Sequence, residues 1–593
     1  MREISVPASY QLGPQENLTD VIVDNATRRP NLTVLSRPGP DGWAEITSTG
    51  FLAEVTAVAK GLVASGVQPG DRIGLLSKTR YEWTLFDFAI WFAGAVTVPI
   101  YETSSAEQVR WILSDSAAVT LIVETTKHQA MVSGLQPDLP SLRQILTIDG
   151  GAVADLTATG ATVDDAQIEE RRRSLTADSV ATIIYTSGTT GRPKGCELTH
   201  ANFLGLARSA ATLFPDLVNE DASTLLFLPL AHVFARYIQI LSLVAGSTLG
   251  HSPTVTNLLA DLAAFQPTYL LAVPRVFEKI YNGAEAKAQA GGKGAIFARA
   301  AETAVAYSKA LDNGGPGLPL KLKHAVFDRL VYSKLRTATG GRLNGSVSGG
   351  APLGPRLGHF FRGIGLPVLE GWGLTETAAP ATVNTLAQNK IGTVGRPLPG
   401  TTIRLGPDDE LQVKGVGVLR GYYNNPPGAE SLVDGWFHTG DLGSIDDDGF
   451  VSITGRKKEI LITAGGKNVV PAVLEDHLRA HPLISQCIVV GDQKPFIGCL
   501  ITLDAEMLPT WLSNHGKATL TVEQAASDPE VKTELQRAVD AANAQVSKAE
   551  SIRKFEVLTT DFTEASGHLT PKLSLKRAVV MKDFATQVES LYS

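Results

Sequence analysis

The sequence predicts an α/β protein with a large N-terminal domain of layered α/β sheets and a smaller α+β C-terminal domain. Apolar runs of strand length, such as 72–76 and 120–123, alternate with longer helical patterns. This alternation is typical of α/β layers with largely parallel sheets. Residues 392–453 instead read as short strands separated by Gly, Pro and Asp turns, and they predict a compact β subdomain. A chain of 593 residues is also too long for one core, so at least two domains are expected.

The pattern changes again after Gly455, where a shorter series of strand and helix signals begins. We therefore expect an N-terminal domain over 1–455, which includes the β subdomain, and a C-terminal domain over 456–593. Helical patterns interrupted by glycines fill 281–341 and predict a helical excursion inserted into the N-terminal domain.

The composition of the chain argues against several classes of protein. The formal net charge of −7 argues against a nucleic-acid binder but leaves room for a small polyanionic ligand. The three cysteines form no CxxC or Cys/His cluster, so neither a zinc site nor a disulfide framework is predicted. The N-terminus lacks an apolar signal region, and no apolar run reaches the roughly 18 residues of a membrane helix. We expect a cytoplasmic protein; peripheral membrane association stays open, although the sequence reveals no amphipathic anchor.

The strongest local signal is an eleven-residue segment that runs from Tyr185 to Gly195 and contains the letters TSGTTG. It directly follows the apolar run 181–184. Small hydroxyl residues and glycines let backbone N–H groups close around phosphate oxygens, and a lysine adds a point charge. The spacing is not that of the G-x-x-x-x-G-K-[ST] loop. Such a composition is often only a loop, but its order after a buried strand favours a phosphate site. The candidate residues are Thr186, Ser187, Gly188, Thr189, Thr190, Gly191 and Lys194.

A second segment, 371–377, carries side chains suited to a nucleotide. Trp372 supplies a large flat π face. Glu376 offers hard carboxylate oxygens for Mg²⁺, and Thr375 offers a hydroxyl or, alternatively, a helix cap. Further along, the carboxylate of Asp441 can accept hydrogen bonds from both ribose hydroxyls.

The order of these segments resembles that of the adenylate-forming superfamily, which includes acyl-CoA synthetases, luciferases and peptide-synthetase adenylation domains. The resemblance runs from residue 46 to residue 577. It implies an ATP-dependent ligase that uses Mg²⁺ and coenzyme A and has a mobile C-terminal domain. Segment 228–236 resembles the family segment at the acyl site. Segment 273–280, followed by the helical excursion, looks like the long-chain branch, so a fatty acid is the expected substrate.

The resemblance also assigns roles around the nucleotide. An aromatic residue stacks on adenine beside a glycine-rich loop, an aspartate binds the ribose, and an arginine contacts ribose and phosphate. A threonine faces the α-phosphate and a glutamate holds Mg²⁺. The corresponding residues of this sequence are Trp372, Gly373, Gly349, Gly350, Ala351, Asp441, Arg456, Thr375 and Glu376.

Roles in the C-terminal domain follow from the same resemblance. Lys458 matches the hinge about which this domain turns, and Gly465 and Gly466 match a loop that lines the pantetheine tunnel. The C-terminal motif departs from the long-chain pattern, because Ser574 stands where the first lysine of a pair is expected. Lys576 is our first choice for the lysine that assists adenylation, and Lys572 is the alternative.

The same resemblance implies an acyl site near His232, which would lie close to the carboxylate and gate the acyl tunnel, with a purely structural histidine as the alternative. Apolar stretches 241–244 and 258–265 are candidate channel walls, although core packing is the commoner use of such residues.

The predicted activity is that of a long-chain fatty acid–CoA ligase, which converts ATP, a fatty acid and CoA into acyl-CoA, AMP and diphosphate. Other readings are a fatty acyl-AMP ligase that loads a carrier protein, a peptide-synthetase adenylation domain and a catalytically silent nucleotide-binding protein. Chain-length preference and oligomeric state are left open.

Overall fold

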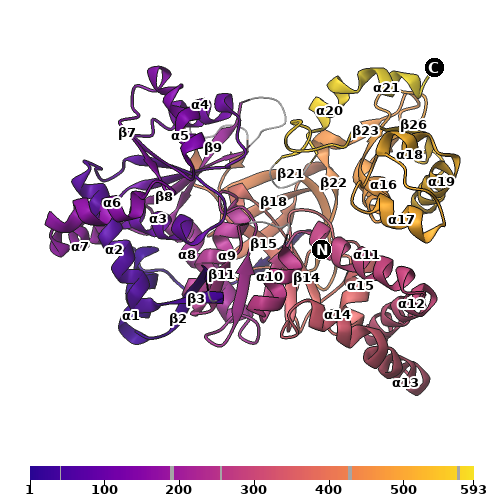
Figure 1. Ribbon diagram of the computed structural model, residues 1–593, viewed down its shortest axis with the longest axis horizontal. Helices are drawn as coiled ribbons and strands as arrows, with labels where there is room; N and C mark the ends of the chain where they lie inside the picture. Colours follow the sequence, from indigo (N-terminus) through magenta and orange to yellow (C-terminus); the bar gives the residue numbers. More distant parts are fainter. Residues whose placement is uncertain (41, 187–191, 254–256, 425–430, 571–574) are drawn as a thin grey trace.

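Three layered sheets form the N-terminal domain, and a smaller α+β domain follows at the C-terminus (Figure 1). The computed structural model describes residues 1–593 except 41, 187–191, 254–256, 425–430 and 571–574. The α/β class predicted from the alternation of strands and helices is confirmed. No helix among the described residues is both long and apolar enough to cross a bilayer.

The first sheet has seven strands in the order β19-β9-β8-β5-β4-β6-β7, and its β4 to β8 strands run parallel. β9 turns back antiparallel to β8, so the predicted phosphate segment connects two neighbouring strands. The strands are β4 (Arg72–Leu76), β5 (Val96–Ile100), β6 (Thr120–Val123), β7 (Gln144–Thr147), β8 (Val180–Thr186), β9 (Lys194–Thr199) and β19 (Gly421–Tyr422).

The second sheet has nine strands in the order β16-β15-β14-β13-β12-β10-β11-β2-β3, with a parallel centre and antiparallel edges. The carboxyl ends of its parallel strands open toward ligands in folds of this kind. The strands are β2 (Thr33–Gly39), β3 (Gly42–Thr47), β10 (Ser223–Leu226), β11 (Thr248–His251), β12 (Tyr269–Ala272), β13 (Gly345–Ser348), β14 (Val368–Leu374), β15 (Ala379–Val383) and β16 (Arg396–Pro397).

The third sheet is antiparallel and contains most strands of the predicted β subdomain. The first strand of the chain joins its edge by pairing with β17, a long-range contact that local patterns do not reveal. The strands are β1 (Glu3–Val6), β17 (Thr401–Leu405), β18 (Glu410–Gly415), β20 (Leu432–Val433), β21 (Trp436–Ile445) and β22 (Val451–Arg456).

Helices pack between and around these sheets. α3 contacts strands of both large sheets, and eleven of its twelve residues are buried, which fits its apolar sequence. The helices up to β12 are α1 (Thr19–Arg28), α2 (Ser48–Ala64), α3 (Tyr81–Phe92), α4 (Ala106–Asp115), α5 (Thr126–Ser133), α6 (Ala152–Thr159), α7 (Asp165–Arg173), α8 (His200–Leu213), α9 (Val233–Ala245) and α10 (Leu258–Phe265).

A fully buried ion pair fastens α9 to α3. Nε of Arg236 donates to Oδ2 of Asp87 at 2.9 Å, and Thr97 and Gln239 donate further hydrogen bonds to the same carboxylate. Both charged side chains are wholly inaccessible to solvent. Because a buried charge is tolerated only when it is paired and hydrogen-bonded, this cluster fixes where α9 begins.

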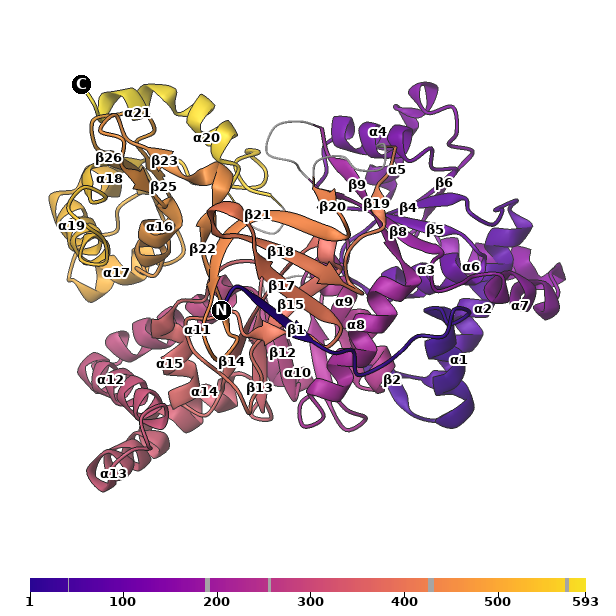
Figure 2. The ribbon, with the colours of Figure 1, turned by 180° about the vertical axis from the view of Figure 1, so that it is seen from behind.

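The predicted helical excursion is present and begins at Pro274, where a proline occupies the first turn of a helix. It extends away from the sheets, and Figure 2 shows its outer end at α13. Its elements are α11 (Pro274–Ala290), α12 (Gly294–Leu311), α13 (Leu318–Phe327), the π-helical η3 (Asp328–Tyr332) and α14 (Ser333–Ala338), and α15 (Pro355–Gly363) packs against α12.

The C-terminal domain has its own apolar cores. In the described part of the chain, each buried apolar cluster holds residues either up to 453 or from 461 onward, never both. Its strands are β23 (Leu461–Ile462), β24 (Asn468–Val469), β25 (Ile484–Val490), β26 (Ile497–Leu503) and β27 (Ile552–Leu558). Its helices are α16 (Pro471–Arg479), α17 (Leu508–Asn514), α18 (Val522–Ser527), α19 (Pro529–Asn543), α20 (Arg577–Asp583) and α21 (Ala585–Ser590).

Candidate active site

A cavity of about 3450 Å³ lies between the two domains and is lined by residues of both. It collects most of the site residues predicted from the sequence, although these are spread over nearly 400 positions. Those in its lining are Thr186, Lys194, His232, Gly349, Gly350, Ala351, Trp372, Gly373, Thr375, Glu376, Asp441, Arg456, Lys458 and Lys576. Gly465 and Gly466 are outside this lining. The predicted residues Ser187, Gly188, Thr189, Thr190, Gly191 and Lys572 lie outside the described residues.

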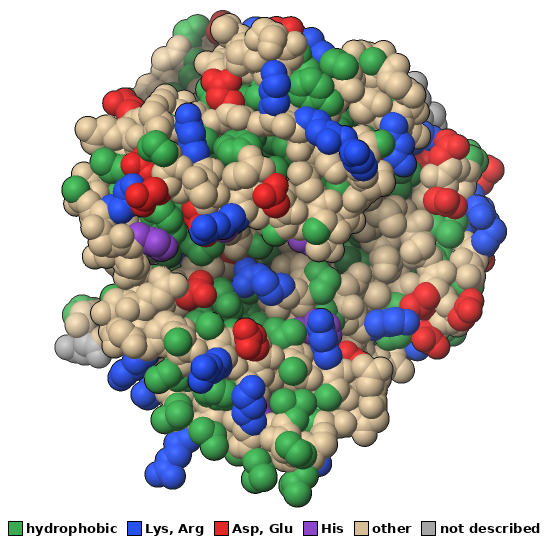
Figure 3. Space-filling model, turned by 90° about the vertical axis from the view of Figure 1, so that its right-hand side faces the viewer, with side chains coloured by type: hydrophobic (Ala, Val, Ile, Leu, Met, Phe, Trp, Pro, Cys, Tyr) green, Lys and Arg blue, Asp and Glu red, His purple; other side chains and the backbone are tan. Residues whose placement is uncertain are grey.

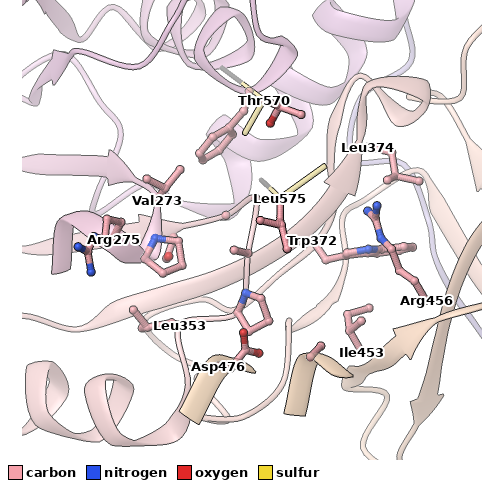
Figure 4. Close-up of a pocket in the computed structure, with 18 of the residues that line it drawn as sticks. Val273, Arg275, Leu353, Trp372, Leu374, Ile453, Arg456, Asp476, Thr570 and Leu575 are labelled. Carbon is pink, nitrogen blue, oxygen red and sulfur yellow. The ribbon is translucent and has the colours of Figure 1, made fainter. Parts of the chain in front are cut away.

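Trp372, Asp441 and Arg456 form a hydrogen-bonded group on one wall of the cavity. The indole Nε1 of Trp372 donates to Oδ2 of Asp441 at 2.8 Å, and Nε of Arg456 donates to Oδ1 at 2.8 Å. Asp441 and Arg456 face each other across the β21–β22 pair, so the sheet register brings them together. The negative charge of Asp441 raises the pKa of Arg456. Figure 4 shows Arg456 beside the indole of Trp372.

This group presents an aromatic face next to a nearly buried carboxylate. A carboxylate has about four lone-pair sites, so Asp441 can still accept hydrogen bonds from a ligand while it holds both neighbours. An aromatic plane beside an oriented acceptor suits a flat base joined to a sugar.

Glu376 lies at the other end of the wall, in the short helix η4 (Thr375–Thr377) between β14 and β15. Tyr422 donates its hydroxyl to Oε1 of Glu376 at 2.9 Å. Burial and then the charge of Glu376 raise the pKa of Tyr422, so this phenol stays protonated and remains a donor. Nζ of Lys194 lies 5.4 Å from the centroid of the Tyr422 ring. Tyr422 thus connects the predicted phosphate segment to the predicted metal ligand.

The backbone around Glu376 is tightly folded. A Cβ at Gly373 would lie 2.0 Å from the carbonyl oxygen of Ala379, so only glycine fits there. Ala378 and Ala379 both have positive φ, at 55° and 95°, which is unusual for alanine and marks a strained turn. Strain of this kind is common beside ligand sites.

Among the described residues, no three His, Cys, Asp or Glu side chains form a group able to hold a metal ion. Glu376 is a single carboxylate in the cavity lining. This fits Mg²⁺, which is commonly bound by one or two carboxylates together with substrate phosphates, rather than by a complete protein cage.

Glu370, which the sequence analysis did not single out, supports the glycine loop that follows β13. Its Oε1 accepts a hydrogen bond from the backbone N–H of Leu353 at 2.9 Å, and Gly350 in the loop has a φ of +83°. Burial, with a smaller contribution from the charge of Asp476 in the C-terminal domain, raises the pKa of Glu370 to about 7. The pKa of Asp476 is itself raised by burial to about 6. Two acidic groups thus meet where the domains face each other.

His232 is the N-cap residue of α9, and its Nδ1 accepts a hydrogen bond from the backbone N–H of Phe234 at 3.2 Å. The ring is held in place by this cap and lines the cavity. Of the predicted channel walls, Leu241 lines the cavity and no residue of 258–265 does, because α10 packs elsewhere. The apolar side chains in this part of the lining are Phe214, Leu217, Val218, Phe234, Tyr237, Leu241, Tyr269, Leu271 and Val347.

The C-terminal domain places Lys576, at the start of α20, on the cavity. Polar contacts with the helical excursion hold this arrangement. Nη2 of Arg275 lies 2.5 Å from Oδ2 of Asp504, and Nζ of Lys279 lies 2.9 Å from Oε2 of Glu506. Figure 4 shows Arg275 on the left of the pocket, with Leu575 of the C-terminal domain near its centre and Thr570 above.

Comparison with known proteins identifies the family of this chain. Residues 22–423 match the model of the AMP-binding enzyme family, and residues 458–593 match the model of the AMP-binding enzyme C-terminal domain. The chain belongs to the AMP-binding enzyme family.

Among its relatives are the long-chain-fatty-acid–CoA ligases FadD15 of Mycobacterium bovis and Mycobacterium tuberculosis, which are 52% and 51% identical over 598 residues and 100% of each chain. A peroxisomal long chain acyl-CoA synthetase 6 of Arabidopsis thaliana is 30% identical, with 91% of this chain and 80% of the relative covered.

Solved structures share the fold. The anthranilate CoA ligase AuaEII in complex with anthranoyl-AMP aligns with a TM-score of 0.72 at 21% identity, over 96% of this chain and 98% of the other. The A-PCP didomain of the carboxylic acid reductase from Segniliparus rugosus, in complex with AMP, aligns with a TM-score of 0.74 at 21% identity, over 99% and 84%.

Proposed function

We propose that this protein is a long-chain fatty acid–CoA ligase that works through an acyl-adenylate. The observation that carries the proposal is the convergence of Trp372, Asp441, Glu376 and Lys576 on one interdomain cavity, in a chain that is similar over its full length to long-chain-fatty-acid–CoA ligases. The proposed small-molecule substrates are ATP, a fatty acid and CoA.

In the first half-reaction, a carboxylate oxygen of the fatty acid attacks the α-phosphorus of ATP and diphosphate leaves. Trp372 would stack on adenine while Asp441 and Arg456 hold the ribose. Thr186, the loop after it and Lys194 would bind phosphate oxygens. When two anions approach each other, the site must supply positive charge and hydrogen-bond donors directed at the developing charge.

Glu376 would hold Mg²⁺, which when bound neutralises phosphate charge and orients the leaving group. Thr375 would face the α-phosphate and Lys576 would approach the same phosphate from the C-terminal domain. Tyr422 would keep the Glu376 carboxylate in place through its hydroxyl. His232, fixed by its cap, would lie where the fatty carboxylate enters.

In the second half-reaction, the thiol of CoA attacks the acyl carbonyl carbon, loses its proton, and AMP leaves. We propose that residues 456–593 turn about Lys458 between the two steps, withdraw Lys576 and bring Gly465 and Gly466 to the cavity. The placement of Lys576 on the cavity and of Gly465 away from it corresponds to the arrangement for the first step.

The activity is tested with a series of fatty acids of increasing chain length, supplied with ATP, Mg²⁺ and CoA. We expect AMP release and acyl-CoA formation with long chains. ATP–diphosphate exchange without acyl-CoA formation would instead favour a ligase that loads a carrier protein. Failure to exchange diphosphate with any fatty acid would leave only a silent nucleotide-binding protein.

Two matched variants separate the half-reactions. Lys576→Ala should slow adenylation and spare thioester formation from supplied acyl-AMP. Gly465→Leu should do the reverse, because a Cβ at Gly465 comes no nearer than 3.9 Å to any atom here and bulk would matter only after the domain turns. If both variants impair the same step, the proposed domain rotation is wrong.

A further inference from the structure

The outer helix of the excursion, α13, together with the start of η3, exposes a row of apolar side chains. Leu318, Leu322, Val326 and Leu330 recur every four residues, and we call them the apolar ridge. Residues four apart lie on one face of a helix. Their exposed fractions are 69%, 63%, 57% and 50%, the four highest of the excursion's apolar side chains. Figures 1 and 2 both place α13 at the tip of the excursion, away from the sheets.

The helix is firmly fastened by its opposite face, so the exposure of the ridge does not come from a loose segment. Nε2 of His324 lies 2.6 Å from the carbonyl oxygen of Gly363, and its ring stacks on Tyr307 with centroids 3.9 Å apart. Phe327 packs against the main apolar core. A helix that is anchored by one face and apolar on the other presents a fixed surface.

The segment that carries the ridge is basic. The segment 309–336 has six Lys or Arg and two Asp, a formal charge of +4, in a chain whose total is −7. Both aspartates are already paired: Asp312 with Arg362 at 2.6 Å and Asp328 with Arg336 at 2.7 Å. The remaining basic residues are Lys309, Lys321, Lys323, Arg329 and Lys334. Figure 3 shows basic and hydrophobic side chains together at the lower end of the molecule.

We propose that α13 docks on an anionic membrane surface, with the apolar ridge at the boundary of headgroups and acyl chains and the lysines on lipid phosphates. An apolar row with a basic border is the pattern of helices that lie in the membrane interface. A second copy of this chain fits less well, because a two-fold contact through the ridge would place Lys321 and Lys323 near their own counterparts.

This inference goes beyond the proposed function and does not depend on it, but it gives that function a source of substrate. Fatty acids and their CoA esters are amphiphiles that collect in bilayers. The cavity reaches α12 at Val305 and Lys309, at the end of this helix that leads to α13.

The sequence did not reveal this anchor, because its residues are apolar at a spacing that also fits a buried helix face. Phe327 of the same helix indeed packs against the main apolar core. Only the fold decides which of the two apolar faces is covered. The proposal therefore departs from the expectation that the chain has no amphipathic anchor, and the vesicle experiment decides between them.

The test is co-flotation of the full chain, without ATP or CoA, with vesicles of phosphatidylcholine alone or mixed with phosphatidylglycerol. We expect binding to the mixed vesicles, weakened by salt. The ridge variant Leu318→Ser/Leu322→Ser/Val326→Ser should lower partitioning at least about tenfold. The charge variant Lys321→Gln/Lys323→Gln should lower it about fivefold for each lysine. Leu259→Ser is the matched control, since Leu259 is 51% exposed on α10.

None of the substituted residues lines the cavity, so turnover of a fatty acid presented without membranes should be unchanged in every variant. The proposal is overturned if the native chain does not float with anionic vesicles, or if the ridge variant floats as well as the control. It is also overturned if sedimentation velocity shows a dimer that the ridge variant abolishes while vesicle binding persists. Because no nucleotide is present, these results do not bear on the ligase reaction.

Discussion

Asp441 is the side chain whose removal tests the nucleotide site most directly. It accepts hydrogen bonds from Trp372 and Arg456, both at 2.8 Å, and it is nearly buried. We compare Asp441→Ala, which removes both carboxylate oxygens, with Asp441→Asn, which keeps one oxygen and the size of the side chain.

The expected loss of ATP affinity follows from the groups that lose a hydrogen-bond partner when Asp441 is replaced. Each hydrogen bond that Asp441 accepts from a ribose hydroxyl contributes about 1.5–3 kcal/mol to the binding of ATP, because the acceptor is charged. Loss of both hydrogen bonds lowers the binding free energy by about 3–6 kcal/mol, which is at least a hundredfold in ATP affinity. The indole N–H of Trp372 loses its acceptor too, at a cost of about 1–3 kcal/mol to the position of the ring. Arg456 is half exposed, so loss of its ion pair contributes less than about 1 kcal/mol.

Asp441→Asn retains one acceptor and should lose about half of the ribose term, which is roughly tenfold to a hundredfold in affinity. Calorimetric titration with ATP and the ATP dependence of diphosphate exchange measure both effects. Thermal unfolding checks that the fold is intact. Asp408→Ala is the control, because Asp408 is a carboxylate outside the cavity lining; its partner at 3.0 Å, Lys457, is in the lining and is left unchanged. Unchanged ATP affinity in Asp441→Ala would refute the assignment of the ribose site.

Three further changes test the framework around the site. Arg236→Met leaves the charge of Asp87 buried and unpaired, and should lower the free energy of unfolding in urea by about 3–5 kcal/mol. Asp504→Ala breaks the interdomain pair with Arg275 and should slow diphosphate exchange severalfold while sparing thioester formation. Glu370→Gln should flatten the pH dependence of stability. In the folded protein the pKa of Glu370 is about 7, above the ordinary 4.5, so the native chain loses up to about 3 kcal/mol of unfolding free energy as the pH rises between these values. Unfolding at pH 5 and pH 8 measures this loss.

Each of these expectations has an outcome that contradicts it. A second substitution, Asp87→Leu, should recover much of the stability lost in Arg236→Met, and failure to do so would mean that packing rather than charge is responsible. Swapping the charges of Arg275 and Asp504 should restore exchange if the ion pair matters. A pH profile of Glu370→Gln that keeps its slope would place the responsible proton on another group.

The sequence predicted the parts of this molecule that local order determines. Strand-length apolar runs and helical periods are short-range patterns, and they located β4, β6 and β8 correctly. The motifs around Trp372 and Asp441 were recognisable because their chemistry lies in consecutive residues. The structure then brought them together on one cavity.

Residues whose roles depend on distant partners were not predictable in the same way. Tyr422 reaches Glu376 because β19 pairs with β9, more than 200 residues earlier in the chain. Glu370 reads as part of an ordinary strand until its contact with the N–H of Leu353 is known. Likewise, no local signal shows that the first strand, β1, completes a sheet whose next strand begins at Thr401.

The nature of the interdomain contact bears on how one domain could serve two reactions. In the described part of the chain, no apolar cluster crosses between the domains, while Arg275–Asp504 and Lys279–Glu506 do. An apolar interface would have to expose its area to water during rotation, at about 25 cal/mol for each Å². The exposed pair Lys279–Glu506 exchanges its protein partner for water at a net cost of about 1 kcal/mol. Arg275–Asp504 is mostly buried and costs more to separate, but it is a single pair whose charges regain water when the domain leaves. A polar contact can therefore select the arrangement with Lys576 on the cavity without preventing the domain from leaving it.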